Sequence, residues 1–174
     1  MNSPPPAPVG ATGVLSRLGM HCRGGALELG YEEGSVRVLA DGDRYLVRLD
    51  QGEEVVESLT TMIRGRGIGG GSISGIGMFS QVELLFQDPV TGQSQRRSLE
   101  GSLSAVSLLG NISYRGYLPE VTLAVVLADA EFDVRGGRLV SGEVLGSCEL
   151  FVNSVVERVK RLPEERSGMP LLQV

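Results

Sequence analysis

The sequence predicts an α+β fold: a compact single domain built on a largely antiparallel β-sheet with a few flanking helices. A length of 174 residues with 41% apolar residues suffices for one domain with a hydrophobic core. A segment near residues 52–64 repeats apolar residues at helical spacing. The segments after it are short, apolar or alternating and are joined by turns, which does not fit a repeated βαβ order.

The N-terminal part divides into two pieces. Residues 1–13 consist mainly of Pro, Ala, Gly and Ser, so we expect a flexible tail. Residues 14–41 form an N-terminal extension whose pattern is ambiguous, with a candidate strand at its end. Apolar residues alternate on both sides of the turn DGD: Val36, Val38, Tyr45, Val47 and Leu49. This pattern favours a hairpin, with order beginning around Val36.

A helix is predicted from about Gly52 to Arg64. Its apolar residues recur at helical spacing: Val55, Val56, Leu59, Met62 and Ile63. Glutamates cluster at the start of this segment and arginines at its end, which suits the helix dipole. Gly65 is expected to end the helix, because glycine commonly follows a helix C-terminus.

Strands are predicted for most of the remaining chain. A long strand begins near Ser72, and its alternation places Met78, Val82 and Leu84 on one face and Phe79 on the other. DPVTGQ forms a turn and SQRRSLEGS returns the chain. LSAVSLLGNISY and EVTLAVVLAD indicate buried strands, and VRGGRL a turn into a short strand. GSCELFVNSVVERV indicates a last strand whose end fits a helix equally well.

The glycine-rich stretch IRGRGIGGGSISGIG contains a G-x-G-x-x-G pattern and an R-G-R core. A dinucleotide site needs a strand before the glycines and a helix after them, and here the order is reversed. No lysine follows in the position that a phosphate-binding loop requires. The R-G-R core lacks the proline of an AT-hook and lies at a helix end. We therefore interpret this stretch as a helix cap with surface charge, followed by a strand.

Composition argues against several kinds of site. The net charge of −5 is not typical of a stand-alone nucleic-acid-binding protein. His21 is the sole histidine, so Ser–His or Cys–His catalysis would depend on it. Cys22 and Cys148 are far apart without metal spacing, and we interpret them as reduced thiols. The carboxylates with candidate acid or base roles show no specific spacing and are expected to be solvated: Asp129, Asp133, Glu143 and Glu149.

The chain contains no apolar run of the roughly 18 residues that a membrane span needs. Its first residues, MNSPPPAPVGATG, lack the features of a secretory signal. We therefore expect a cytoplasmic protein without membrane contact.

Six segments in order resemble the PPC domain, the plants-and-prokaryotes conserved domain that accompanies AT-hooks in plants. They are RYLVRLDQGEEVVESL, GGGSISGIGMFSQVELLF, SLLGNIS, LPEVTLAVVLAD, VRGGRLVSG and RLPEERSGMPLL. The resemblance covers residues 42–174. It implies a compact domain around an antiparallel sheet, assembled as a homotrimer.

The resemblance also implies a metal site in many prokaryotic members, formed by three histidines. Thr122, Ala124 and Arg138 stand in those positions here. Alanine has no ligand atom, arginine is not deprotonated, and a threonine hydroxyl is a poor lone ligand. We therefore expect no metal and no cofactor. Arg138 could pair with a carboxylate such as Asp129, bind an anion or face solvent, and the sequence does not decide between these.

The resemblance thus predicts a non-catalytic, trimeric module in gene regulation, which binds or assembles with DNA or with a DNA-binding partner. The alternative is a small-molecule-binding protein or an enzyme that uses a pocket between subunits. No catalytic residue is assigned. The candidate pocket comprises Asn111, Thr122, Asp129, Arg138, Gly75 and Gly77.

Overall fold

The computed structural model describes residues 28–33, 36–163 and 170–173. The elements are β1 (Glu28–Glu33), β2 (Val36–Asp41), β3 (Arg44–Asp50), α1 (Val55–Arg66), β4 (Gly70–Gln87), β5 (Ser94–Arg115), β6 (Leu118–Ala128), β7 (Val134–Val155), β8 (Arg161–Pro163) and β9 (Pro170–Leu172). The expected tail, His21 and Cys22 lie outside the described residues. Among the described elements α1 is the one α-helix, so the expectation of a few flanking helices overstated the helical part.

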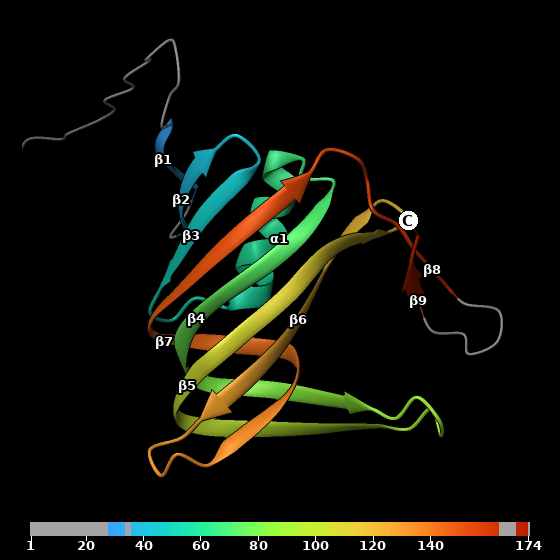
Figure 1. Cartoon of the computed structure of the whole chain (residues 1–174). Helices are drawn as coiled ribbons and strands as arrows, with labels where there is room; N and C mark the ends of the chain where they lie inside the picture. Colours follow the sequence, from blue (N-terminus) through green and yellow to red (C-terminus); the bar gives the residue numbers. More distant parts are fainter. Residues whose placement is uncertain (1–27, 34–35, 164–169, 174) are drawn as a thin grey trace, which may run out of the picture.

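The main sheet is antiparallel and has the strand order β1-β2-β3-β7-β4-β5-β6. Residues 134–139 of β7 pair with β6, and residues 138–155 of β7 pair with β4. Strands β4 to β7 therefore close on themselves at one end of the molecule, at the bottom of Figure 1. At the other end β6 and β7 diverge, and α1 packs against both of them. In the part of the chain that the structure describes, no helix has the length and apolar character to cross a membrane.

The predicted helix is confirmed, but its end differs. Val55, Leu59, Met62 and Ile63 are buried, as the helical spacing predicts. The helix continues through Gly65 and stops before Gly67, which has a left-handed φ of 65°. Gly67 N donates to Arg64 O at 3.3 Å, and Ile68 N donates to Ile63 O at 3.1 Å. This is the Schellman arrangement, in which the buried Ile68 supplies the apolar contact.

The predicted faces of β4 are wrong at one point. Phe79 is fully buried, and Val82 and Leu84 are buried on its side of the sheet, whereas Met78 is 42% exposed. The pairing of β4 with both neighbours shifts between Phe79 and Gln81. A β-bulge inserts one extra residue, so simple alternation no longer predicts which face a side chain occupies.

The last strand is longer than the pattern indicates. The segment VRGGRL belongs to β7, where Gly136 and Gly137 pair with Val126 and Val125 of β6. The strand then continues to Val155 without becoming helical. The expected turn and the helical alternative at the end are therefore both wrong.

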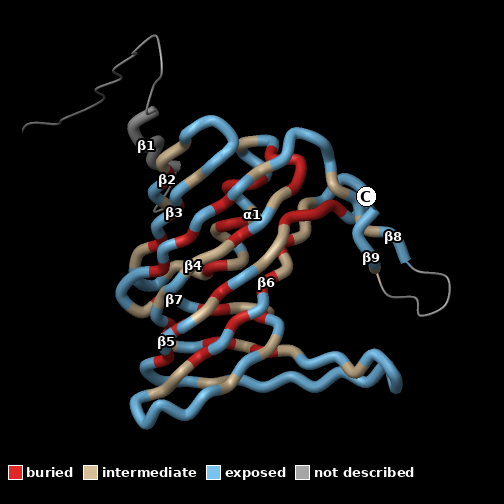
Figure 2. Tube along the Cα trace, viewed as in Figure 1, coloured by how far each residue is buried: buried red, intermediate tan, exposed pale blue. Residues whose placement is uncertain are grey.

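The core lies between α1 and the sheet and continues into the closed end, as the buried positions in Figure 2 show. The buried residue Cys148 belongs to it, and burial raises the pKa of this thiol to about 12. The opposite side of the sheet, which we call the outer face, carries exposed apolar side chains. They include Leu46, Ile76, Met78, Val106, Leu109, Val126 and Phe151.

Candidate functional site

Three of the candidate pocket residues, Asn111, Thr122 and Arg138, lie together on the outer face with Ala124. Ala124 of β6 is opposite Arg138 of β7, and Thr122 of β6 is opposite Asn111 of β5. Thr122 and Ala124 are two residues apart on one strand, so their side chains point to the same side. Cross-strand pairing thus brings together the three positions that the resemblance assigns to lost histidines.

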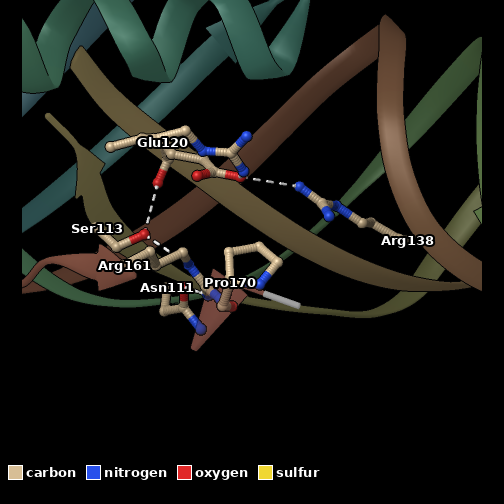
Figure 3. Close-up of polar contacts among 7 residues, drawn as sticks. Asn111, Ser113, Glu120, Arg138, Arg161 and Pro170 are labelled. Carbon is tan, nitrogen blue, oxygen red and sulfur yellow. Dashed lines mark hydrogen bonds and ion pairs between the residues drawn. The ribbon is translucent and has the colours of Figure 1, made fainter. Parts of the chain in front are cut away.

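Glu120 is the acidic partner in this cluster, and it was not singled out from the sequence. Arg138 donates from Nη2 to Glu120 Oε1 at 3.3 Å (Figure 3). Arg115 donates to the same oxygen at 3.1 Å. The side chain of Glu120 is only 19% exposed. Glu120 precedes Thr122 by two residues, so strand alternation could have placed it on this face.

The suggested pairing of Arg138 with Asp129 is wrong. Asp129 accepts a hydrogen bond from Arg135 Nη1 at 2.7 Å and another from Asp133 N at 2.9 Å. The hydrogen bond from Arg135 is the main cause that lowers the pKa of Asp129. Asp129 follows the last residue of β6, whereas Glu120 lies near the first, so the two carboxylates flank Ala124 in opposite directions along the chain.

Gly75 and Gly77 do not join the cluster. A Cβ atom at Gly77 would come within 2.8 Å of Cys148 Sγ, and one at Gly75 would collide with Leu150 and with the backbone of Glu149. Both glycines therefore point towards β7 and the buried side of the sheet. They allow close approach within the sheet and do not line a pocket with Arg138.

Arg161 of β8 ties the C-terminal strands to the same region (Figure 3). Its guanidinium donates to Asn111 Oδ1 at 2.9 Å, to Ser113 Oγ at 2.9 Å and to Pro170 O at 3.0 Å. One arginine thus connects β5, β8 and β9. No sequence pattern indicated this role, because the contacts join residues about fifty positions apart.

The residues present do not suit a metal ion. The described part of the chain contains no group of three or more His, Cys, Asp or Glu that could hold one. Among the described residues, Glu120 Oε2 and Thr122 Oγ1 are buried without a hydrogen-bond partner, but Ala124 adds no ligand atom. The guanidinium groups of Arg115 and Arg138 would repel a cation at this place. The cluster is instead an ion-pair site with two arginines around one carboxylate.

The helix α1 and the strands β5 and β7 all end at one end of the molecule (Figure 1), and several cationic residues belong to these chain ends or to segments next to them. The residues are Arg44, Arg64, Arg66, Arg115, Arg158, Lys160 and Arg161. Arg158 stacks over the ring of Tyr114, with 4.5 Å between its Cζ and the ring centroid, and Arg66 lies 5.6 Å from the ring of Tyr45. Backbone hydrogen bonds join these segments, from Tyr114 N to Val159 O and from Val159 N to Gly69 O.

Among the residues whose side chains the structure describes, four acidic residues lie at the same end: Asp41, Asp43, Glu120 and Glu157. Positive charge is therefore in excess among these described side chains, although the whole chain has a net charge of −5. We call this region the basic end. The opposite end contains the acidic turn between β6 and β7, with Asp129, Glu131 and Asp133.

Comparison with solved structures shows the same fold in three other proteins. A "putative DNA-binding protein" from Bacteroides thetaiotaomicron is 24% identical, with a TM-score of 0.77 over 80% of this chain and 98% of that chain. A plant- and prokaryote-conserved (PPC) protein from Pyrococcus horikoshii is 28% identical, with a TM-score of 0.69 over 83% of this chain and 98% of that chain. A metal-containing protein from Archaeoglobus fulgidus is 29% identical, with a TM-score of 0.69 over 76% of this chain and 94% of that chain.

No curated protein sequence matches the chain. The family model of the Plants and Prokaryotes Conserved (PCC) domain matches residues 36–156, which confirms the resemblance seen in the sequence. That match begins with β2 and ends just after β7, so it contains the ion-pair cluster and all of α1. This protein therefore belongs to the PCC domain family.

Proposed function

We propose that this protein is a non-catalytic, homotrimeric binding or assembly module that acts in gene regulation and associates with DNA, directly or through a DNA-binding partner. The observation that carries the DNA association is the basic end. The structurally similar protein from Bacteroides thetaiotaomicron is named a "putative DNA-binding protein", which also supports an association with DNA.

The basic end changes how the acidic composition is interpreted. Phosphate neutralisation depends on locally clustered cations more than on the net charge of the chain. Within the described residues, Arg44, Arg64 and Lys160 have no ion-pair partner. Arginine and lysine side chains without an acidic partner are free to contact phosphate oxygens.

The described side chains also support a non-catalytic role. A thiolate nucleophile requires a lowered pKa, whereas burial raises the pKa of Cys148 to about 12. The acidic residues Asp129 and Glu120 are held in ion pairs with arginines. Neither arrangement leaves a group poised to take or give a proton.

The test measures DNA binding by fluorescence anisotropy at several salt concentrations. The triple variant Arg44→Gln, Arg64→Gln, Lys160→Gln removes three unpaired cations at the basic end. A matched control removes three cations elsewhere: Arg37→Gln, Arg48→Gln, Arg96→Gln. We expect salt-sensitive binding by the wild type and at least about tenfold weaker binding by the first variant only. The slope of log affinity against log salt should fall by about 0.9 for each DNA phosphate that the variant no longer neutralises.

Equal losses in both triple variants would refute the role of the basic end. Absence of salt-sensitive binding by the wild type would refute direct DNA contact. In that case a ligand-induced rise in melting temperature would support the alternative, a small-molecule site between subunits.

A further inference from the structure

We propose that the projecting arm formed by β4 and β5 in one copy docks into a hollow on the outer face of a second copy. The arm is defined as residues 86–97, and the hollow is lined by Ile76, Met78, Ser104, Val106, Ser147 and Glu149. The inference rests on the assembly part of the proposed function, and it names the surfaces that meet.

Among the residues that the structure describes, nothing outside β4 and β5 pairs with the arm. The last pair between β7 and β4 is Arg138 with Leu85, and from Phe86 onward β4 and β5 pair with each other alone within the described strands. Figure 1 shows this ribbon leaving the body of the domain. Phe86 is 63% exposed and Val90 is 90% exposed. A two-stranded ribbon with exposed apolar residues is marginal in water unless something covers it.

The turn at the tip of the arm is nevertheless well organised. Asp88 Oδ1 accepts hydrogen bonds from Val90 N at 2.8 Å and from Thr91 N at 3.2 Å, which lower the pKa of Asp88. Asp88 N also donates to Gln93 O at 2.8 Å. Such a turn presents the arm in a defined shape, which reduces the ordering cost of docking.

The two faces of the arm differ in whether their charges are paired. Arg96 and Glu83 lie on one face and form an ion pair at 2.8 Å. Arg97 pairs across the strands with Leu84, and strand alternation puts it on the same face as Phe86. Within the described residues Arg97 has no ion-pair partner. This face therefore presents one apolar ring beside one unpaired cation.

The hollow offers the complementary groups. It has a volume of about 450 Å³ and is open to solvent. Ile76, Met78 and Val106 are 59%, 42% and 56% exposed. The face of an antiparallel sheet that contacts water ordinarily carries polar side chains, so these apolar residues are unusual there. An exposed apolar patch of this kind marks an interaction surface.

Glu149 supplies the charge that matches Arg97. It lies at the edge of the hollow, and among the described residues it has no ion-pair partner. Arg48 is opposite Glu149 in the ladder between β3 and β7, but its Nε donates to Asp50 at 3.1 Å. An unpaired carboxylate beside apolar side chains favours a partner with a cation next to an apolar group.

The contact joins two different surfaces, so each copy gives one arm and receives one. Such a heterologous contact closes into a ring when the rotation between copies allows it. A ring of three copies agrees with the homotrimer that we propose.

The test measures assembly of the full chain by sedimentation and by light scattering after gel filtration. The variants are Phe86→Ser, Arg97→Glu, Glu149→Arg and the double variant Arg97→Glu, Glu149→Arg. Val156→Ser is the control, because Val156 is 95% exposed and lies outside the arm and the hollow. All these positions are exposed, so circular dichroism and melting should show intact domains.

We expect the three single variants to raise the dissociation constant of assembly by at least about tenfold each. The double variant should return to within about threefold of the wild type, because the charges are exchanged. The control should assemble like the wild type.

An assembled wild type with single variants that assemble equally well would overturn this interface and leave the trimer and the DNA association standing. Failure of the double variant to recover would overturn the pairing of Arg97 with Glu149. A monomeric wild type at all concentrations would overturn both the interface and the trimer. DNA binding, measured separately, does not depend on any of these outcomes.

Discussion

Replacement of Arg138 and Glu120, singly and together, tests whether this ion pair holds β6 and β7 together where they begin to diverge. The substitutions Arg138→Met and Glu120→Gln keep the approximate size of each side chain and remove its charge. The pair joins the two strands through Nη2 and Oε1 at 3.3 Å. The double variant completes a double-mutant cycle, which isolates the interaction between the two residues.

The expected coupling energy follows from the geometry. Two unit charges at this distance attract by roughly 1 kcal/mol in water and by more where solvent is partly excluded. Arg138 is 42% exposed and Glu120 is 19% exposed, so screening acts mainly on the arginine. Arg115 shares the same oxygen at 3.1 Å and compensates in part. We therefore expect a coupling of about 0.5–1 kcal/mol, within the range for exposed ion pairs.

The assay is urea unfolding at a fixed protein concentration, since assembly changes the apparent free energy of unfolding. A parallel cycle with Arg138→Met and Asp129→Asn is the control, because Asp129 pairs with Arg135. Its coupling should be close to zero. A coupling energy below about 0.3 kcal/mol for the first cycle, or an equal value for the control, would refute the assignment of Glu120 as the partner of Arg138.

Four further outcomes are expected. Gly67→Ala should lower the free energy of unfolding by about 1 kcal/mol in urea titrations, because Gly67 has a φ of 65° that alanine adopts at a cost, whereas Gly65→Ala inside the helix should not. Gly77→Ala should lower it by about 1–3 kcal/mol by the same measurement, because the added Cβ meets Cys148 at 2.8 Å; a loss below about 0.5 kcal/mol would contradict the close approach. The lowered pKa of Asp129 contributes stability above its unfolded-state pKa, and this contribution is lost as the pH falls through the lower folded-state value. Acid titrations followed by circular dichroism should therefore show a steeper loss below about pH 4 for the wild type than for Asp129→Asn. Peptide mapping after iodoacetamide treatment at about pH 8 should find Cys148 unmodified in the folded protein and modified in urea, because burial raises its pKa to about 12.

The helix shows how far sequence patterns reach. The positions of Val55, Leu59, Met62 and Ile63 predict its buried face, because helical periodicity is a local property. The choice of Gly65 over Gly67 as its end was wrong because both are glycines near the last apolar residue. Attention to Ile68 would have helped, since an apolar residue directly after the left-handed glycine is typical of a Schellman motif.

The ion-pair cluster could be predicted only in part. Motif resemblance singled out Thr122, Ala124 and Arg138, and the register of β5, β6 and β7 brings those positions together. The partner of Arg138 could not be chosen, because Glu120 and Asp129 lie on either side of Ala124 at similar sequence distances. Only the tertiary structure shows that the Arg138 side chain extends towards Glu120, so that Glu120 is its ion-pair partner.

By itself, the sequence determined the presence of α1, the mainly antiparallel strands that follow it and membership of the PCC family, since each depends on local periodicity or on ordered short motifs. The tertiary structure decided which face each side chain occupies after the bulge at Phe79 and how cations from distant segments form the basic end. It also placed Phe86 and Arg97 on one face of the arm. The charge of Arg97 is opposite to that of Glu149, which lines the hollow. The physical reason is that strand pairing joins residues far apart in the chain, so one extra residue in one strand redirects every side chain beyond it.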